Sequence, residues 1–135
     1  MEQQNLILIL ARELADKLAT AMFVVDHEGR LVYFNERAAD ILGQSFGSVG
    51  RMELAQWAEA WQPTDLSGRR LTPAELPLAA ALSRQEPAHS SFRITGTDGS
   101  TRDIAATAFP LMAHQGEFVG AAAIFWEQPG RQGGE

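Results

Sequence analysis

The chain has 135 residues, of which 45% are hydrophobic and 21% charged, and its 11 basic and 17 acidic residues give a net charge of −6. This length predicts one domain with a sizeable core, and the acidic balance argues against nucleic acid or an anionic membrane as a partner. The sequence contains no cysteine, which excludes disulfides, thiolate metal sites and cysteinyl adducts and favours a cytoplasmic location.

Residues 3–20 are predicted to form an amphipathic helix, because apolar residues recur at steps of three and four. The first turns carry more apolar residues than one buried stripe needs. Burial on its own domain and contact with a second copy of the chain both remain open, and a short strand at residues 6–10 is a third alternative. The apolar run is too short to cross a bilayer and lacks the basic front of a signal peptide. The stripe consists of Ile7, Leu10, Leu14, Leu18 and Ala21.

Residues 22–34 predict a β-hairpin. Two apolar runs rich in strand-forming residues flank a polar turn, and Gly29 at its end supplies the positive φ that such a turn needs. Asn35 directly afterwards is a helix-capping residue, and Gly43 ends the helix that follows.

The segment 44–70 is the least regular part of the sequence. Residues 45–50 predict a loop, and residues 52–61 predict a short helix that carries Trp57 and Trp61.

A clearer helix start follows at Thr72. Together with Glu75 it forms a capping box, with a proline at the first helical position. We expect this helix to continue through Pro77 to about Arg84.

From His89 onward the pattern changes to period two. Strands are predicted at residues 91–95, 101–112 and 118–126, with turns at Asp98-Gly99 and at residues 114–117. The sequence therefore predicts an α+β domain with one antiparallel sheet and helices on one face. The expected organisation is an N-terminal helix over 1–20, the domain over 21–127 and a disordered tail over 128–135.

This succession of motifs resembles the PAS domain family over about residues 20–127. The resemblance implies a five-stranded antiparallel sheet in the order 2-1-5-4-3, helices arched over one face, and often a small-molecule pocket between them. It also implies a sensory or dimerising module rather than an enzyme. The residues that carry it are Asp26-x-x-Gly29, Asn35, Gly43, Leu76-Pro77-Leu78, Asp98-Gly99, Pro110-Leu111 and Gly120.

The family's cofactors can be tested against this sequence. Light-sensing members form a flavin adduct through a cysteine, which is excluded here because the chain has none. Haem-binding members resemble one another in a histidine on the helix before the third strand, and residues 72–84 contain none, so haem is not expected. Noncovalent flavin or an apolar metabolite stays open. His27, His89 and His114 fall in or near turns and predict no metal or catalytic site.

Strand alternation and the family's fold predict which side chains face the helices. Several of them are alanines, which leave space that something must fill. Either the helices close on the alanines and form a dry core, or the alanines floor an apolar cavity with a few polar groups, such as Tyr33 or an indole N–H, as handles. The residues predicted to line this space are Phe23, Val25, Tyr33, Trp57, Trp61, Leu78, Leu82, Ile104, Ala106, Ala108, Ala122 and Ile124.

The opposite sheet face is predicted to be apolar as well, with Ala105 and Phe109 among its residues. A sheet face exposed to water normally carries polar residues, so the helix 3–20 should cover it, either from the same chain or from a partner. We therefore expect a homodimer through this helix and the outer sheet face. The predicted interface residues are Ile7, Leu10, Leu14, Leu18, Ala121, Ala123 and Phe125.

Three functions follow from these expectations. The first is a sensor that binds an apolar small molecule and signals through the homodimer or a separate signalling protein. The second is a ligandless interaction module. The third, less favoured, is an enzyme in a cone-shaped α+β fold, which would need an interior carboxylate with a raised pKa. Asp103 is the nearest strand carboxylate, and we expect it to be solvated beside its turn.

Overall fold

The computed structural model describes residues 2–113 and 116–128, and within them all side chains except those of residues 2–5 and 48. The expectation for the tail beyond Gln128, and the turn residues His114 and Gln115, fall outside the described residues. The elements in chain order are α1 (Glu2–Lys17), β1 (Ala21–Asp26), β2 (Leu31–Phe34), α2 (Glu36–Leu42), α3 (Phe46–Val49), α4 (Leu54–Ala60), the 3-10 turn η1 (Pro73–Glu75), α5 (Pro77–Arg84), β3 (Ala88–Thr95), β4 (Thr101–Met112) and β5 (Phe118–Glu127).

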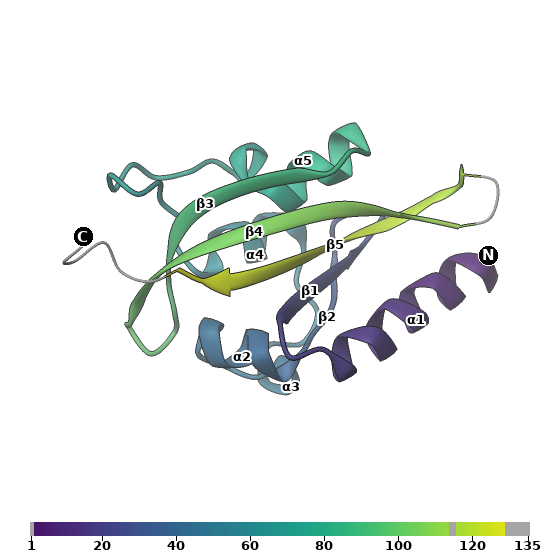
Figure 1. Cartoon of the computed structure of the whole chain (residues 1–135), viewed down its shortest axis with the longest axis horizontal. Coiled ribbons are helices and arrows are strands. Elements are labelled where there is room, and N and C mark those ends of the chain that lie inside the picture. The colour runs from purple at the N-terminus through teal and green to yellow at the C-terminus, as the bar shows by residue number, and fades with distance from the viewer. Residues whose placement is uncertain (1, 114–115, 129–135) are drawn as a thin grey trace.

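The five strands form one antiparallel sheet in the predicted order β2-β1-β5-β4-β3 (Figure 1). The last strand of the chain, β5, lies between β1 and β4, so the first hairpin and the last three strands become one unit. Gly120 allows the close approach of β5 to β1, because a Cβ at this position would lie 2.3 Å from the carbonyl oxygen of Val25.

The turn from hairpin to helix follows the predicted capping chemistry. The Asn35 side chain accepts a hydrogen bond from the backbone N–H of Ala38 at 3.0 Å, which satisfies one free donor of the first turn of α2. Gly43 ends the helix with a left-handed φ of 88°.

Two helical segments differ from the prediction. Residues 46–49 form the short helix α3 where a loop was expected. The helix expected over residues 72–84 is two elements, because Leu76 is extended with ψ 144° and separates η1 from α5. The cause is Pro77, whose ring disfavours the helical conformation for the residue before it.

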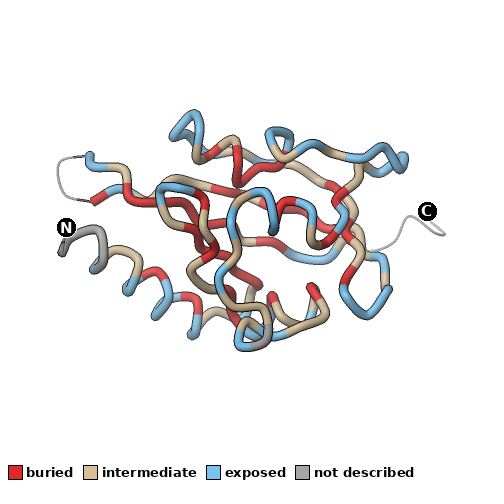
Figure 2. Tube along the Cα trace, turned by 180° about the vertical axis from the view of Figure 1, so that it is seen from behind, coloured by how far each residue is buried: buried red, intermediate tan, exposed pale blue. Residues whose placement is uncertain are grey.

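Each face of the sheet packs a different layer. On the inner face, helices α2, α4 and α5 enclose a large aromatic and aliphatic cluster with β1, β3, β4 and β5. On the outer face, α1 lies along β1, β2 and β5, apart from the other helices (Figure 1). Buried and exposed positions alternate along α1, as expected of a helix that packs by one side only (Figure 2).

Candidate functional site

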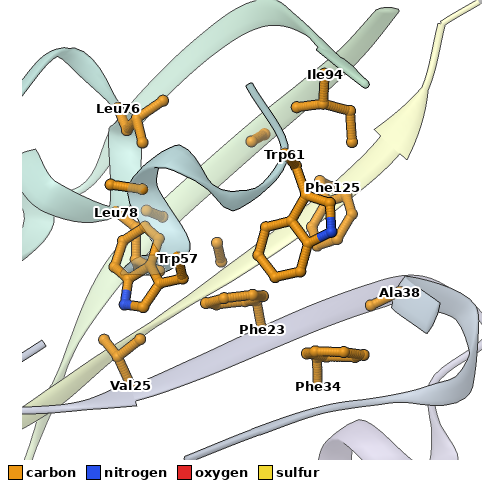
Figure 3. Close-up of a cluster of buried hydrophobic side chains, with 14 of the residues drawn as sticks. Phe23, Val25, Phe34, Ala38, Trp57, Trp61, Leu76, Leu78, Ile94 and Phe125 are labelled. Carbon is orange, nitrogen blue, oxygen red and sulfur yellow. The ribbon is translucent and has the colours of Figure 1, made fainter. Parts of the chain in front are cut away.

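The inner cluster is centred on Phe23 of β1. Trp57 and Trp61 of the α4 region contact it edge-on, with ring centroids 5.3 and 6.1 Å away, and Phe34 of β2 stacks beside it at 5.8 Å (Figure 3). The two tryptophans are four residues apart, so they leave the helix on the same side and both reach the sheet. Edge-on and offset aromatic pairs of this kind stabilise each other beyond the area that they bury.

The two indoles differ in their hydrogen bonding. The Nε1–H of Trp57 donates to the carbonyl oxygen of Gly29 at 2.6 Å, which joins α4 to the turn between β1 and β2. The Nε1 of Trp61 is equally buried and has no hydrogen-bond partner. Thus Trp57 anchors α4 to the turn between β1 and β2, and Trp61 places an unpaired hydrogen-bond donor in the core.

A cavity of about 80 Å³ lies between these tryptophans and the sheet. Its lining is almost entirely apolar, and side chains of α4, α5 and strands β1, β3, β4 and β5 contribute to it. An engineered cavity of about 150 Å³ holds benzene, so this one is roughly half that size. The predicted ligand-binding residues that line it are Phe23, Trp57, Trp61, Leu78, Ile104 and Ala106.

The other predicted lining residues lie elsewhere. Val25 and Ala108 belong to the inner cluster without lining the cavity, and Leu82 packs against the edge of that cluster. Tyr33 and Ile124 pack in the outer cluster beneath α1. Prediction of the inner face was therefore correct for β1 and β4 and wrong for Tyr33.

Prediction of the two faces of β5 was wrong by one residue. Ala121, Ala123 and Phe125, expected on the outer face, belong to the inner cluster, whereas Ala122 and Ile124 belong to the outer one. The register explains the placement, since Phe23 lies directly opposite Ala123 and partners across a ladder share a face. Residues 119–125 are apolar without alternation because both faces of the sheet are covered. The sequence pattern therefore does not show which of these residues face inward.

Sequence reasoning missed several residues of the cavity. Phe92 and Ile94 of β3 line it and alternate with polar neighbours, a period-two signal that could have identified them. Leu42, Pro63 and Leu76 also line it. They come from three different connections and helix ends, which only the folded chain brings together.

Helix α1 contacts the outer face with a different stripe from the one expected. Ala11 and Ala15 are buried against β1 and β5, flanked by Leu8 and the half-buried Leu18. Of the predicted interface residues, Ile7 is half-buried, while Leu10 and Leu14 are each 53% exposed. The small alanines let the helix approach the sheet, and Leu10 and Leu14 lie on the exposed side of the helix.

Asn35 joins this helix to the domain. It is the one buried polar residue among those the structure describes, and its side-chain oxygen also accepts from the N–H of Met22 at 3.1 Å. Its amide nitrogen donates to the carbonyl oxygens of Ala15 and Thr20, both at 2.9 Å. One amide group therefore connects the end of α1, the start of β1 and the first turn of α2.

A second polar contact lies beside it. The Tyr33 hydroxyl donates to Asp16 of α1, and the guanidinium of Arg12 lies 4.6 Å from the centre of the tyrosine ring. Burial raises the pKa of Tyr33 to about 12, and the hydrogen bond to Asp16 acts in the same direction. Tyr33 thus helps to hold α1 rather than to line the cavity.

The remaining ionisable candidates lie away from the cavity. Asp103 pairs with Arg93 on the outer face, with 2.7 Å between Oδ1 and Nε. His27 is near Glu28 at the surface, and His89 contacts Thr107 and Trp126. No group of three or more potential metal ligands occurs within residues 2–113 and 116–128.

No helix in the described part of the chain is long and apolar enough to cross a membrane.

Solved structures with the same fold are numerous and distant in sequence. The PAS domain of a protein from Colwellia psychrerythraea is 18% identical with a TM-score of 0.63, and covers 90% of this chain and 97% of its own. The PAS domain of Bordetella pertussis BvgS is 20% identical with a TM-score of 0.61, at 92% and 87% coverage. A Rhodobacter sphaeroides LOV protein is 18% identical with a TM-score of 0.69, at 98% and 71% coverage. At such identities the likeness shows the fold alone.

Comparison of sequences gives the family. No curated protein matches the chain. A family model described as PAS fold matches residues 15–128, which include every strand of the sheet and every helix of its inner layer. The chain belongs to the PAS fold family.

Proposed function

We propose that this chain is a sensory PAS module that binds an apolar small molecule between the sheet and the helices. Occupancy of the cavity would be transmitted through a homodimer or to a separate signalling protein. The observation that carries the proposal is the apolar cavity beside Trp61, in a core that is otherwise filled with large aromatic rings. Protein interiors are close-packed, and voids larger than a water molecule are few in any one domain. A cytoplasmic location remains an expectation from composition.

A ligandless interaction module is the second candidate. The small volume of the cavity, about 80 Å³, supports it, because a core that closes around such a space can remain stable without a ligand. The same volume argues against flavin or haem in this conformation, since each is far larger than benzene.

The two candidates are separated by chemical analysis of what copurifies with the protein. Protein purified from cells would be extracted with organic solvent, and the extract analysed by mass spectrometry beside that of the variant Ala106→Leu, whose larger side chain fills the cavity. The sensor proposal expects a small molecule that is stoichiometric in the native extract and depleted in the variant. Identical extracts would favour the ligandless module.

The homodimer proposal rests on the outward side of α1. Leu6, Ile9, Leu10 and Leu14 are each about half exposed, and together they form an apolar stripe on a helix that already covers the sheet. A second copy is the occupant that suits it, because a stripe along one helix is self-complementary about a two-fold axis. The half-buried Ile7 borders the stripe.

Sedimentation velocity at micromolar concentration tests the dimer. The native chain is expected to sediment as a dimer, and the double variant Leu10→Glu with Leu14→Glu as a monomer, because both charges would be buried without partners. Ser83→Glu on the exposed side of α5 is the control and should leave the dimer intact. A native monomer, or a dimer that survives the double variant, contradicts this interface.

A further inference from the structure

The unpaired indole of Trp61 points to the chemistry of the cavity's occupant. Among the buried side-chain nitrogen and oxygen atoms of the described residues, only Trp61 Nε1 and Arg102 Nε lack a hydrogen-bond partner. Arg102 still pairs with Glu127 through its terminal nitrogen, 3.0 Å away, where β4 begins and β5 ends. Trp61 is 4% exposed and lines the cavity, and its N–H has no hydrogen-bond partner within the protein.

A buried donor without an acceptor disfavours the folded state, and an acceptor supplied from outside would remove that penalty. The equivalent donor of Trp57 is already satisfied by Gly29, which shows that this helix can pair an indole where the fold requires it. The N–H of Trp57 is thus a donor that the fold itself uses, whereas the N–H of Trp61 is available to a ligand.

The rest of the lining restricts the occupant further. None of the described side chains that line the cavity carries a charge, and leucine, isoleucine, phenylalanine, proline and alanine account for the lining apart from the two indoles. A charged ligand would lose its hydration without finding a counter-ion there. The volume of about 80 Å³ is roughly half that of a cavity that holds benzene, so the occupant is smaller than benzene unless the helices move.

We propose that the ligand is a small, uncharged and mainly hydrocarbon molecule with one hydrogen-bond acceptor, such as a ketone, ether or ester oxygen, which accepts from the Trp61 Nε1–H. This inference rests on the proposed binding function of the cavity and adds to it the class of ligand. Trp61 then serves as a specificity-determining residue, and Phe23, Trp57 and Ile104 supply the apolar walls.

Two probes of equal shape test the acceptor. Acetone and isobutene differ only in C=O against C=CH₂, and both are smaller than benzene. Their dissociation constants would be measured by NMR titration for the native protein and for Trp61→Phe, which keeps an aromatic ring and removes the donor. The ratio of the ketone's constant to the alkene's is expected to rise about fivefold in the variant, the factor that one ordinary hydrogen bond contributes. Comparing ratios cancels the different hydration of the two probes.

The control is Trp126→Phe, which should leave the ratio unchanged because Trp126 is exposed and does not line the cavity. The indole N–H resonance of Trp61 in the native protein provides a second readout that needs no variant. It should shift with the ketone and barely move with the alkene.

The outcomes separate the two proposals. If both probes bind but the ratio and the Trp61 resonance do not distinguish them, the acceptor inference is overturned and the cavity's binding function stands. If neither probe binds in the cavity, the binding function itself is overturned.

Discussion

The two faces of the sheet are built in opposite ways. The inner face is packed with large rings, since Phe23 contacts Phe34, Trp57 and Trp61 at ring distances of 5.3–6.1 Å. The outer face meets α1 at the methyl groups of the buried Ala11 and Ala15, flanked by the partly buried Leu8 and Leu18. Large interdigitated rings stabilise a core strongly, whereas an alanine seam buries little area per residue.

This difference assigns different tasks to the two layers. The inner layer holds the domain together, and α1 is held on the outer face by its small apolar seam and by polar contacts from Asn35 and Tyr33. Elements with few buried apolar contacts open most readily. We therefore expect α1 to detach at a lower free energy than the inner core unfolds.

Truncation of an inner ring should have the largest effect. Phe23→Ala is expected to lower the free energy of unfolding by about 3–5 kcal/mol, because it leaves a hole at the centre of the aromatic cluster. Urea denaturation measures this loss. Phe109→Ala on the outer face removes the same ring from a half-buried position and should cost less than half as much. Equal losses would contradict the contrast between the faces.

Removal of the Asn35 side-chain amide, which joins the two layers, should have the second-largest effect on stability. Asn35→Ala leaves two backbone donors and two carbonyl oxygens without their partner, and we expect a loss of about 2–4 kcal/mol in unfolding free energy. Asn35→Ser retains a cap for Ala38 and should lose about 1 kcal/mol less. If serine is as damaging as alanine, the cap contributes nothing measurable.

A larger side chain in the alanine seam should release α1 without unfolding the inner core. Ala15→Leu has no room against the sheet, and the expected cost is about 1–3 kcal/mol. Amide hydrogen exchange should show faster exchange in α1 and little change in β4. The neighbouring Leu14→Ala, at an exposed position, should change stability by less than about 0.5 kcal/mol in the monomer. Uniform acceleration across the sheet would mean that α1 is part of the core.

The smallest effect concerns the protonation of Tyr33. Burial raises the pKa of folded Tyr33 from the ordinary value of about 10 to about 12, so the contribution of its protonated hydroxyl to stability is complete below pH 10 and is lost as the pH rises toward 12. We expect less than about 1 kcal/mol, because solvent screens this contact. Tyr33 is the only tyrosine, so ultraviolet absorbance reports its titration directly. Asp16→Asn should lower the pKa, and an unchanged midpoint would show that Asp16 has no part in the shift.

Sequence reasoning succeeded where a local rule determines the structure. Asn35, Gly29 and Gly43 follow capping and turn chemistry, and the spacing of Trp57 and Trp61 placed both indoles in the core. The family resemblance then supplied the strand order. The caps, the turn and the tryptophan spacing each depend on a few residues that are neighbours in the sequence.

Prediction from the sequence failed where the orientation of a side chain depends on residues far away in the chain. An all-apolar β5 cannot reveal which alanines face inward, because that depends on the register with β1. Steps of three and four predict that the inward stripe of α1 consists of Ile7, Leu10, Leu14, Leu18 and Ala21, but close approach to the sheet selects Ala11 and Ala15. The unpaired donor of Trp61 depends on where every neighbouring carbonyl lies, which no sequence pattern records.

The alanine run of β5 makes the wall between the two layers unusually thin. Ala123 borders the cavity, and the adjacent Ala122 belongs to the cluster under α1. Only a peptide backbone with a methyl group on either side separates an occupant from the helix. A molecule that pushes on the floor of the cavity would therefore displace the support of α1 directly, without any relay of long side chains.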